Sequence, residues 1–283
     1  MQPNEKGKIK PRYRSKNATR LAAVRNTLID GGSHFYNVKD YAKAAQFWGA
    51  FVESGDAAMF EGKVQKDTLY YQIADYAALA AYLSKDYQKA ISYATIALND
   101  AKQKAEAMNI IVSSLKGTCK TKEDSVAYFN KLKEIREKNI DDQSVLFAIN
   151  EYLSQPGRNA EKEAWCAEEV KKQPNDKFLW AFLGESQMNQ QKYDEAVASF
   201  KKTMEIDPNF IEVEYNIGAS LVLKATTMKD QLSGTTGRLT PADAEKVKAV
   251  YTEAQKYLEH VRSVDPDRKK VNWAYTLYQI YYK

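Results

Sequence analysis

Residues 177–208 read KFLWAFLGESQMNQQKYDEAVASFKKTMEIDP, two apolar stretches that are separated by a polar turn and ended by a proline. Within each stretch the large apolar residues recur at three- and four-residue intervals, the spacing of one helix face. Gly184 on the first stretch and Ala196 on the second are small, so two helix axes can approach closely there. Trp180 and Phe200 fill the space on either side. The window therefore predicts two antiparallel helices packed through a glycine.

The ends of this helix pair are also visible in the sequence. Residues 189–192 interrupt the apolar pattern for one turn, and Pro208 cannot continue the second helix. The order of residues resembles the tetratricopeptide repeat (TPR), whose period is about 34 residues. The resemblance rests on Trp180, Leu183, Gly184, Ala196, Phe200 and Pro208. Gln187 and Thr203 depart from the pattern, because a tyrosine and an alanine are usual at these two positions.

Weaker copies of the pair recur at the same period in both directions. Downstream, Gly218 repeats Gly184 one period later, and apolar spacing alone supplies two further pairs in the middle of the chain. Three or more stacked units are needed to bury a continuous core. We therefore expect an all-α, right-handed superhelical solenoid of about six TPR-like helix pairs, with a capping helix at 271–282. The other positions that mark copies are the runs 40–44 and 86–90, and Ala254 and Pro266.

The sequence predicts two regions. Residues 1–15 form a basic linker or arm, and residues 16–283 form the TPR-like helical repeat domain. Thr, Ser and Gly are frequent between 225 and 239, which predicts an inserted loop 225–239 that splits the sixth repeat. Thr240 followed by Pro241 predicts that the second helix of this repeat begins there.

The composition is that of an ordinary globular protein, with 44% hydrophobic and 28% charged residues. The 12 glycines and 7 prolines in 283 residues are too few for a loop-rich β architecture. No stretch approaches the roughly 18 consecutive apolar residues of a membrane helix, so no membrane span is expected. Cys119 and Cys166 match no metal or redox spacing, and we predict no disulfide, no metal site and no cofactor.

Positive charge is concentrated near the N-terminus. Residues 1–25 hold eight basic side chains against Glu5, a balance of +7, which leaves −2 for the rest of a chain whose net charge is +5. Tyr13 is the only aromatic residue there, and no recognised nucleic-acid module follows, so we expect no nucleic-acid binding. The prolines and alternating lysines instead suit a connector.

The segment GKIKPRYR at 7–14 resembles a basic segment that joins helical portions of exported bacterial TPR proteins. The resemblance implies that Met1 was added to a fragment, and that the native protein has a further N-terminal portion with any export signal. The compartment cannot be read from the residues present, and the resemblance favours the periplasm.

The TPR resemblance also implies that the first helices of the pairs line a concave groove, which binds an extended peptide or a partner helix. Exposed aromatic residues there would be anchors, because they bury a large area at little entropic cost. The alternative interpretation is that several of them pack against adjacent repeats. The residues that helical phase places on this face are Gln72, Asp75, Tyr76, Tyr82, Phe178, Phe182, Glu185, Met188, Asn189, Glu212, Tyr215 and Asn216.

One TPR specialism can be tested residue by residue. Chaperone-binding TPR domains grip a terminal carboxylate with Lys, Arg and Asn side chains on their first helices. Asn216 matches one such Asn, but Ala181 stands where Lys is expected, and Glu185 and Glu212 replace an Asn and a basic residue. Two acids repel a carboxylate, so this binding mode is not expected.

Catalytic patterns are weak in this sequence. His34 and His260 are the only histidines, and no nucleophile elbow, phosphate-binding loop or zinc signature is present. The leading hypothesis is a non-enzymatic scaffold that binds a polypeptide in the groove. The alternatives are a structural, self-associating module that packs on a missing N-terminal portion, and, more remotely, a carbohydrate-binding or hydrolase-like activity using groove carboxylates.

Overall fold

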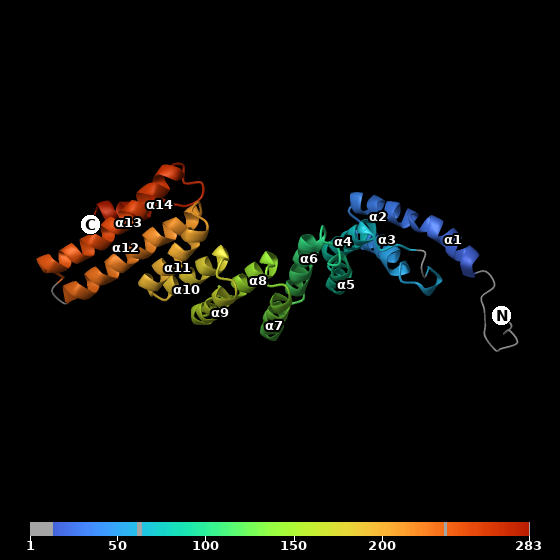
Figure 1. The fold of residues 1–283 in the computed structure, drawn as a ribbon, viewed down its shortest axis with the longest axis horizontal. Helices are drawn as coiled ribbons and strands as arrows, with labels where there is room; N and C mark the ends of the chain where they lie inside the picture. The colour runs from blue at the N-terminus through green and yellow to red at the C-terminus, as the bar shows by residue number, and fades with distance from the viewer. Residues whose placement is uncertain (1–13, 61–63, 235–236, 283) are drawn as a thin grey trace. The chain divides into compact units, whose positions relative to one another are not determined.

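The computed structural model describes residues 14–60, 64–234 and 237–282, and within these ranges every regular element is a helix (Figure 1). The all-α helical-repeat prediction is therefore confirmed. The arm predicted at 1–15 lies outside the described residues except for its last two positions, where α1 begins. The chain divides into two compact units, residues 1–149 and residues 150–283, which we call the first and the second unit.

The first unit is a series of helices in which each packs on the next. Its core is formed by small side chains of α4 and α5, together with large buried rings such as Trp48 of α3 and Tyr70 of α4. Alanines are frequent where these helices meet, so the helices can lie close together. The elements are α1 (Arg14–Arg25), α2 (Thr27–Asn37), α3 (Tyr41–Ser54), the short η1 (Ala58–Phe60), α4 (Thr68–Leu83), α5 (Tyr87–Ala97), α6 (Lys104–Gly117) and α7 (Lys122–Lys138).

Helix α8 (Gln143–Leu153) spans the boundary between the units. The core of the second unit lies between α11, α12 and α13, where Phe200, Ile217 and Leu258 are fully buried. Figure 1 shows α12 and α13 as two long helices lying side by side. The elements of this unit are α9 (Asn159–Lys172), α10 (Lys177–Asn189), α11 (Tyr193–Ile206), α12 (Ile211–Ser233), α13 (Pro241–Val264) and α14 (Trp273–Tyr281).

The glycines of the repeat pattern lie at close helix contacts. A Cβ added at Gly184 would lie 2.7 Å from the ring of Phe200, and one at Gly218 would lie 2.6 Å from Leu258 Cγ. Ala196 and Ala254 are fully buried on the opposing helices. Helices α11 and α13 end at Ile206 and Val264, each two residues before a proline, Pro208 and Pro266. The small residues of the pattern thus lie at close helix contacts, whereas Trp180, which the pattern places beside Gly184, is only half-buried.

Replacing Gly184 with Ala is expected to lower the free energy of unfolding by about 1–3 kcal/mol, because the added Cβ overpacks a closed contact. In an unobstructed helix interior the same change is favourable by about 1 kcal/mol. Urea unfolding followed by tryptophan fluorescence measures the difference. Phe200→Leu in the Gly184→Ala background should recover part of the loss. A Gly184→Ala protein at least as stable as the parent would contradict the close contact.

The predicted inserted loop 225–239 is wrong. Helix α12 continues without interruption to Ser233 and α13 begins at Pro241, so most of the segment predicted as a loop is helical. No glycine or proline occurs from 219 to 233, so no residue in this run breaks the helix. Within the helix pair α12 and α13, Thr226 Oγ1 donates to Val222 O at 2.9 Å. The hydroxyl of Tyr251 on α13 lies 3.0 Å from Thr226 Oγ1.

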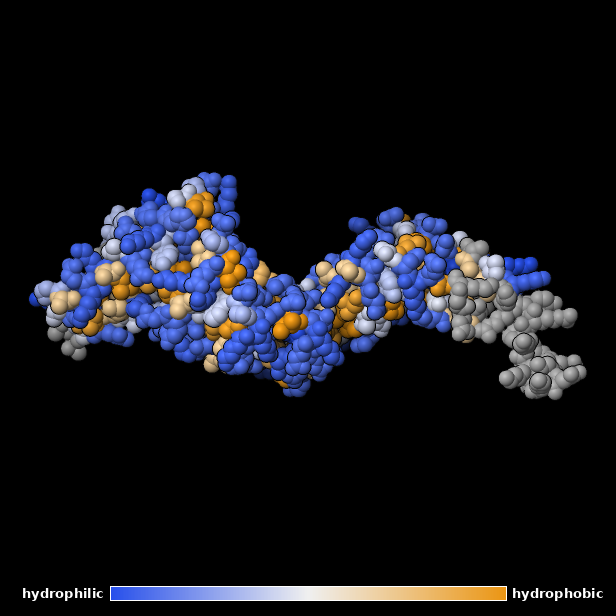
Figure 2. Space-filling model, viewed as in Figure 1, coloured by the Kyte–Doolittle hydropathy of each residue, from blue (hydrophilic) through white to orange (hydrophobic). Residues whose placement is uncertain are grey.

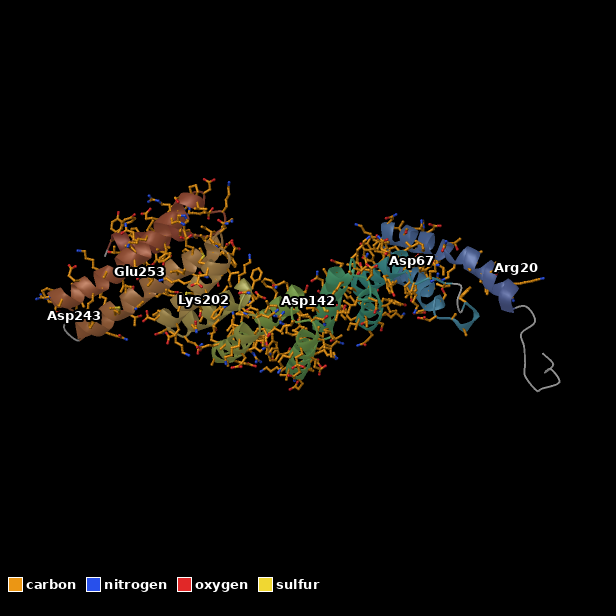
Figure 3. The ribbon with its side chains drawn as sticks, in the orientation of Figure 1. Arg20, Asp67, Asp142, Lys202, Asp243 and Glu253 are labelled. Carbon is orange, nitrogen blue, oxygen red and sulfur yellow. The ribbon has the colours of Figure 1, made fainter. Side chains whose placement is uncertain are left out.

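Several helices begin at the polar side chain that the sequence supplies for capping. Thr240 Oγ1 accepts a hydrogen bond from Asp243 N at 3.2 Å, and Pro241 occupies the first turn, which confirms the predicted start of α13. In the same way Asp67 Oδ1 accepts from Tyr70 N at 3.1 Å at the start of α4. Figure 3 labels Asp67 and Asp243 at these two helix starts.

The aromatic helix predicted at 271–282 is present as α14. Leu277 is buried against the core of the second unit, and Trp273 Nε1 donates to Asp265 O at 2.7 Å. Four tyrosines of this segment remain exposed: Tyr275, Tyr278, Tyr281 and Tyr282. Of the helices described, none combines the length and the apolar character needed to cross a membrane.

Candidate partner-binding faces

The predicted groove residues of the first unit lie on α4, and we call Gln72, Asp75, Tyr76 and Tyr82 the α4 face. The Tyr76 side chain is 38% exposed. Its position is fixed from two sides, because Gln72 Nε2 donates to the Tyr76 hydroxyl at 2.8 Å and the Trp48 ring lies 5.4 Å away. Tyr82 is half-buried beside the ring of Tyr87. The α4 face thus presents one ordered aromatic ring to solvent.

Asp75 differs from its neighbours on the α4 face because it is buried, with only 5% of the residue exposed. Its Oδ1 atom has no hydrogen-bond partner among the described residues. Burial, and then the negative charge of Glu106 on α6, raise the pKa of Asp75 to about 6. A carboxylate in this position carries an electrostatic cost, because both influences on its pKa oppose the negative charge.

The second unit places five predicted groove residues on α10, and we call Phe178, Phe182, Glu185, Met188 and Asn189 the α10 face. Phe178 and Phe182 stack with ring centroids 6.4 Å apart. Phe178 also meets the ring of Phe210 edge-on at 5.9 Å. Both stacked rings are half-buried, so they form an apolar strip along α10.

The aromatic strip is flanked by a cation at its N-terminal end. Lys177 Nζ lies 5.1 Å from the Phe178 ring centroid and 5.2 Å from that of Phe210. The same ammonium group forms a 2.6 Å ion pair with Asp207, and this pairing lowers the pKa of Asp207 below its ordinary value. Lys177 therefore joins the start of α10 to the end of α11 and holds the rings between them.

Glu185 forms the most enclosed ion pair of the second unit among those described. Its Oε2 atom lies 2.5 Å from Nζ of Lys162, whose side chain is 1% exposed. Lys162 also donates to Ser154 Oγ at 3.0 Å and lies 5.5 Å from the Phe182 ring centroid. The negative charge expected at Glu185 is therefore neutralised by Lys162 of the preceding helix, α9.

The remaining groove residues divide between packing and exposure. Met188 and Tyr215 pack against the core of the second unit, and the Tyr215 hydroxyl lies 2.9 Å from Thr276 Oγ1 of α14. For these two residues the packing interpretation is correct. Asn216 is half-buried, whereas Glu212 and Asn189 are exposed. The structure thus does not present all the predicted residues as one open surface.

Two side-chain pairs between neighbouring helices were not anticipated from the sequence. Lys162 precedes Cys166 by four residues and Val170 by eight, so it stands in the apolar stripe of α9, and this spacing could have revealed a buried lysine. Glu214 of α12 is also buried, with both carboxylate oxygens 2.8 Å from His260 Nδ1 of α13. No pattern within either helix signals that second pair.

Metal and thiol chemistry have little support in the part of the chain that the structure describes. No group of three or more His, Cys, Asp or Glu side chains there is arranged to hold a metal ion. Both cysteines are free thiols, and burial raises the pKa of Cys166 to about 12. Cys166 is therefore a neutral core residue at physiological pH. Figure 2 shows a visible surface that is largely hydrophilic, with apolar residues in separate patches.

Comparison with known proteins identifies one repeat family in a part of the chain. The family model described as Tetratricopeptide repeat matches residues 178–210. No curated protein matches the chain in sequence. A TPR repeats protein from Bacteroides fragilis NCTC 9343 is similar in structure, with 14% identity, a TM-score of 0.46, and 91% of this chain and 98% of that chain covered.

Two further solved structures are similar over most of their own length. A thermophilic TPR protein from Thermus thermophilus has 13% identity and a TM-score of 0.36, with 70% of this chain and 99% of that chain covered. YrrB, described as a TPR protein with an unusual peptide-binding site, has 13% identity and a TM-score of 0.32, with 90% and 93% covered. The sequence match is confined to residues 178–210, and the close packing of Gly184 within that helix pair agrees with it.

Proposed function

We propose that this tetratricopeptide repeat protein, whose matched repeat is residues 178–210, is a non-enzymatic scaffold that binds a polypeptide along the first helices of its repeats. The observation that carries the proposal is the placement of aromatic rings beside polar groups on these helices. Tyr76 is exposed next to Gln72 on α4, and Phe182 is half-exposed next to Glu185 on α10. Such mixed faces suit a peptide, which offers both apolar side chains and backbone polar groups.

The rings are suited to binding because they are already ordered. Tyr76 is held by Gln72 and Trp48, and Phe182 is held by Phe178 and Lys162. A partner that covers an ordered ring loses little conformational entropy in the scaffold, so more of the buried apolar area contributes to affinity. The apolar area and the satisfied polar neighbours support binding, whereas a catalytic function lacks comparable support among the described residues.

Selection from a displayed library of random short peptides, using the whole chain as bait, tests this function. Peptides that bind should lose at least about fivefold in affinity when Tyr76→Ala or Phe182→Ala is introduced, because truncating an anchor at an interface costs more than about 1 kcal/mol. Val126→Ala is the control, since Val126 is 47% exposed on α7, a second helix. Circular dichroism would establish that each variant remains folded.

Two results of this selection would contradict the scaffold function. Selected peptides that bind both anchor variants as well as the parent, or a library that yields no binder, would overturn the scaffold proposal. The exposed tyrosines of α14 favour self-association as the second candidate function. Sedimentation of the parent beside a Tyr275→Ser, Tyr282→Ser variant distinguishes the two, because only self-association gives a mass that depends on concentration and on these rings.

A further inference from the structure

We propose that the α4 face, together with Glu106 of α6, holds one cationic side chain of the partner, the ammonium group of a lysine or the guanidinium group of an arginine. The inference rests on the proposed scaffold function and narrows it, since it states which chemistry the first unit selects. The three residues concerned, Asp75, Glu106 and Tyr76, all lie in the first unit.

The first step is the unpaired acid. Asp75 is 5% exposed, and its Oδ1 atom lacks a hydrogen-bond partner among the described residues. Buried carboxylates in proteins are paired with a cation or hydrogen-bonded, because the desolvation of a charge is costly. A carboxylate whose desolvation is not compensated within the protein is a candidate for pairing with a cation supplied by a ligand.

The second step is the neighbouring acid. Glu106 is exposed on α6, the first helix of the next repeat, and its charge acts on Asp75 in the same direction as burial. The two influences that raise the pKa of Asp75 therefore both oppose a negative charge, and neither comes from a cation. Two carboxylates that repel each other create a negative potential which a bound cation would relieve.

The third step is the aromatic ring. Tyr76 follows Asp75 on α4, is 38% exposed, and has its hydroxyl oxygen occupied by the donor Nε2 of Gln72. The face of a tyrosine ring attracts an ammonium or guanidinium group. Asp75 and Tyr76 are neighbours on α4, and the charge of Glu106 acts on Asp75 from α6, so a cation that binds beside Tyr76 would be attracted by both carboxylates, and an acidic peptide would be repelled.

The test uses three synthetic peptide pools that differ at one central position, which is Lys, its uncharged analogue norleucine, or Glu. The flanking positions are equal mixtures of Ala, Ser, Gly, Phe and Tyr. The whole chain should bind the Lys pool about 10- to 100-fold more tightly than the norleucine pool, the fold-change expected for a charge-assisted hydrogen bond. The Glu pool should bind weakest.

Variants assign the preference to named groups. Asp75→Asn should reduce binding of the Lys pool to the level of the norleucine pool, and Glu106→Gln should reduce it partly. Glu123→Gln on α7 is the matched control, because it removes an equal charge from an exposed position of the same unit. Binding of the norleucine pool should stay the same in all three variants.

The outcomes separate this inference from the function beneath it. Equal binding of the Lys and norleucine pools, or a Lys preference that survives Asp75→Asn, overturns the cation site and leaves the scaffold standing. Failure of all three pools to bind overturns both. Thermal unfolding of Asp75→Asn guards against a trivial explanation, since a variant that is at least as stable as the parent cannot lose binding through misfolding.

Discussion

Replacing Glu185 with Gln is expected to lower the free energy of unfolding by about 3 kcal/mol. The reason is that Lys162 keeps its buried position but loses the carboxylate at 2.5 Å, and Ser154 Oγ remains as a neutral acceptor. Breaking an enclosed ion pair by removing one partner typically costs about 3–5 kcal/mol, because it leaves a charge without compensation. Glu185 itself is 43% exposed, which places the expected value at the lower end.

A double-mutant cycle separates this cost from the loss of the pair itself. Lys162→Met combined with Glu185→Gln should restore most of the stability, since the methionine fills a similar volume without a charge. Three of the chain's 4 tryptophans, Trp165, Trp180 and Trp273, lie in the second unit, so tryptophan fluorescence in urea follows its unfolding. Glu168→Gln is the control, because Glu168 and its partner Lys171 are both exposed and such pairs contribute less than about 1 kcal/mol. A Glu185→Gln protein as stable as that control would show that Lys162 does not depend on Glu185.

The helix pair at 177–208 could be predicted because local and tertiary signals agree there. Gly184 and Ala196 are small where the two helices meet, and the large ring of Phe200 fills the space beside Gly184. Pro208 follows the end of the second helix. One detail was not visible. Leu179 is fully buried whereas Trp180 is half-buried, so the buried stripe of α10 is rotated by one residue from the one that the repeat pattern suggests.

The error at 225–239 has a physical cause. Thr, Ser and Gly at one end of that segment are typical of loops, although every residue from 219 to 233 is compatible with a helix. Packing against α13 decides whether these residues are helical, because α12 can extend as far as a similarly long helix packs against its apolar face. The length of the partner helix is a tertiary property that the composition of the segment does not contain.

The sequence indicates which helices carry the candidate faces, but it does not indicate which of their side chains are buried or which of their charges are neutralised. Asp75 and Tyr76 lie on α4 and Phe182 lies on α10, and helical phase predicts their face of the helix from spacing alone. The burial of Asp75 depends on α6, and the neutralisation of Glu185 depends on Lys162 of α9. Those neighbours belong to other repeats, and a single helix pattern does not specify them.

Replacing Asp75 with Asn is expected to stabilise the first unit near neutral pH and to have no effect in acid. The pKa of Asp75 is raised from 3.8 to about 6 in the folded chain. The folded state therefore holds this proton more tightly than the unfolded state, and the protonated group is tolerated below pH 3.8. As the pH rises through about 6, folding must accept the buried charge beside Glu106, and stability is lost. The full difference corresponds to about 3 kcal/mol above that range.

Amide hydrogen exchange of residues 68–83, which form α4, measures this effect within the first unit. At about pH 8 the Asn variant should show slower exchange than the parent, and the two should converge as the pH falls to about 4, because both then carry a neutral side chain. Comparison at equal pH cancels the intrinsic pH dependence of exchange. Glu106→Gln should give a smaller change of the same sign, since burial contributes more than Glu106 to the raised pKa. A difference between parent and Asp75→Asn that is independent of pH would instead assign the effect to packing, because a neutral replacement cannot titrate.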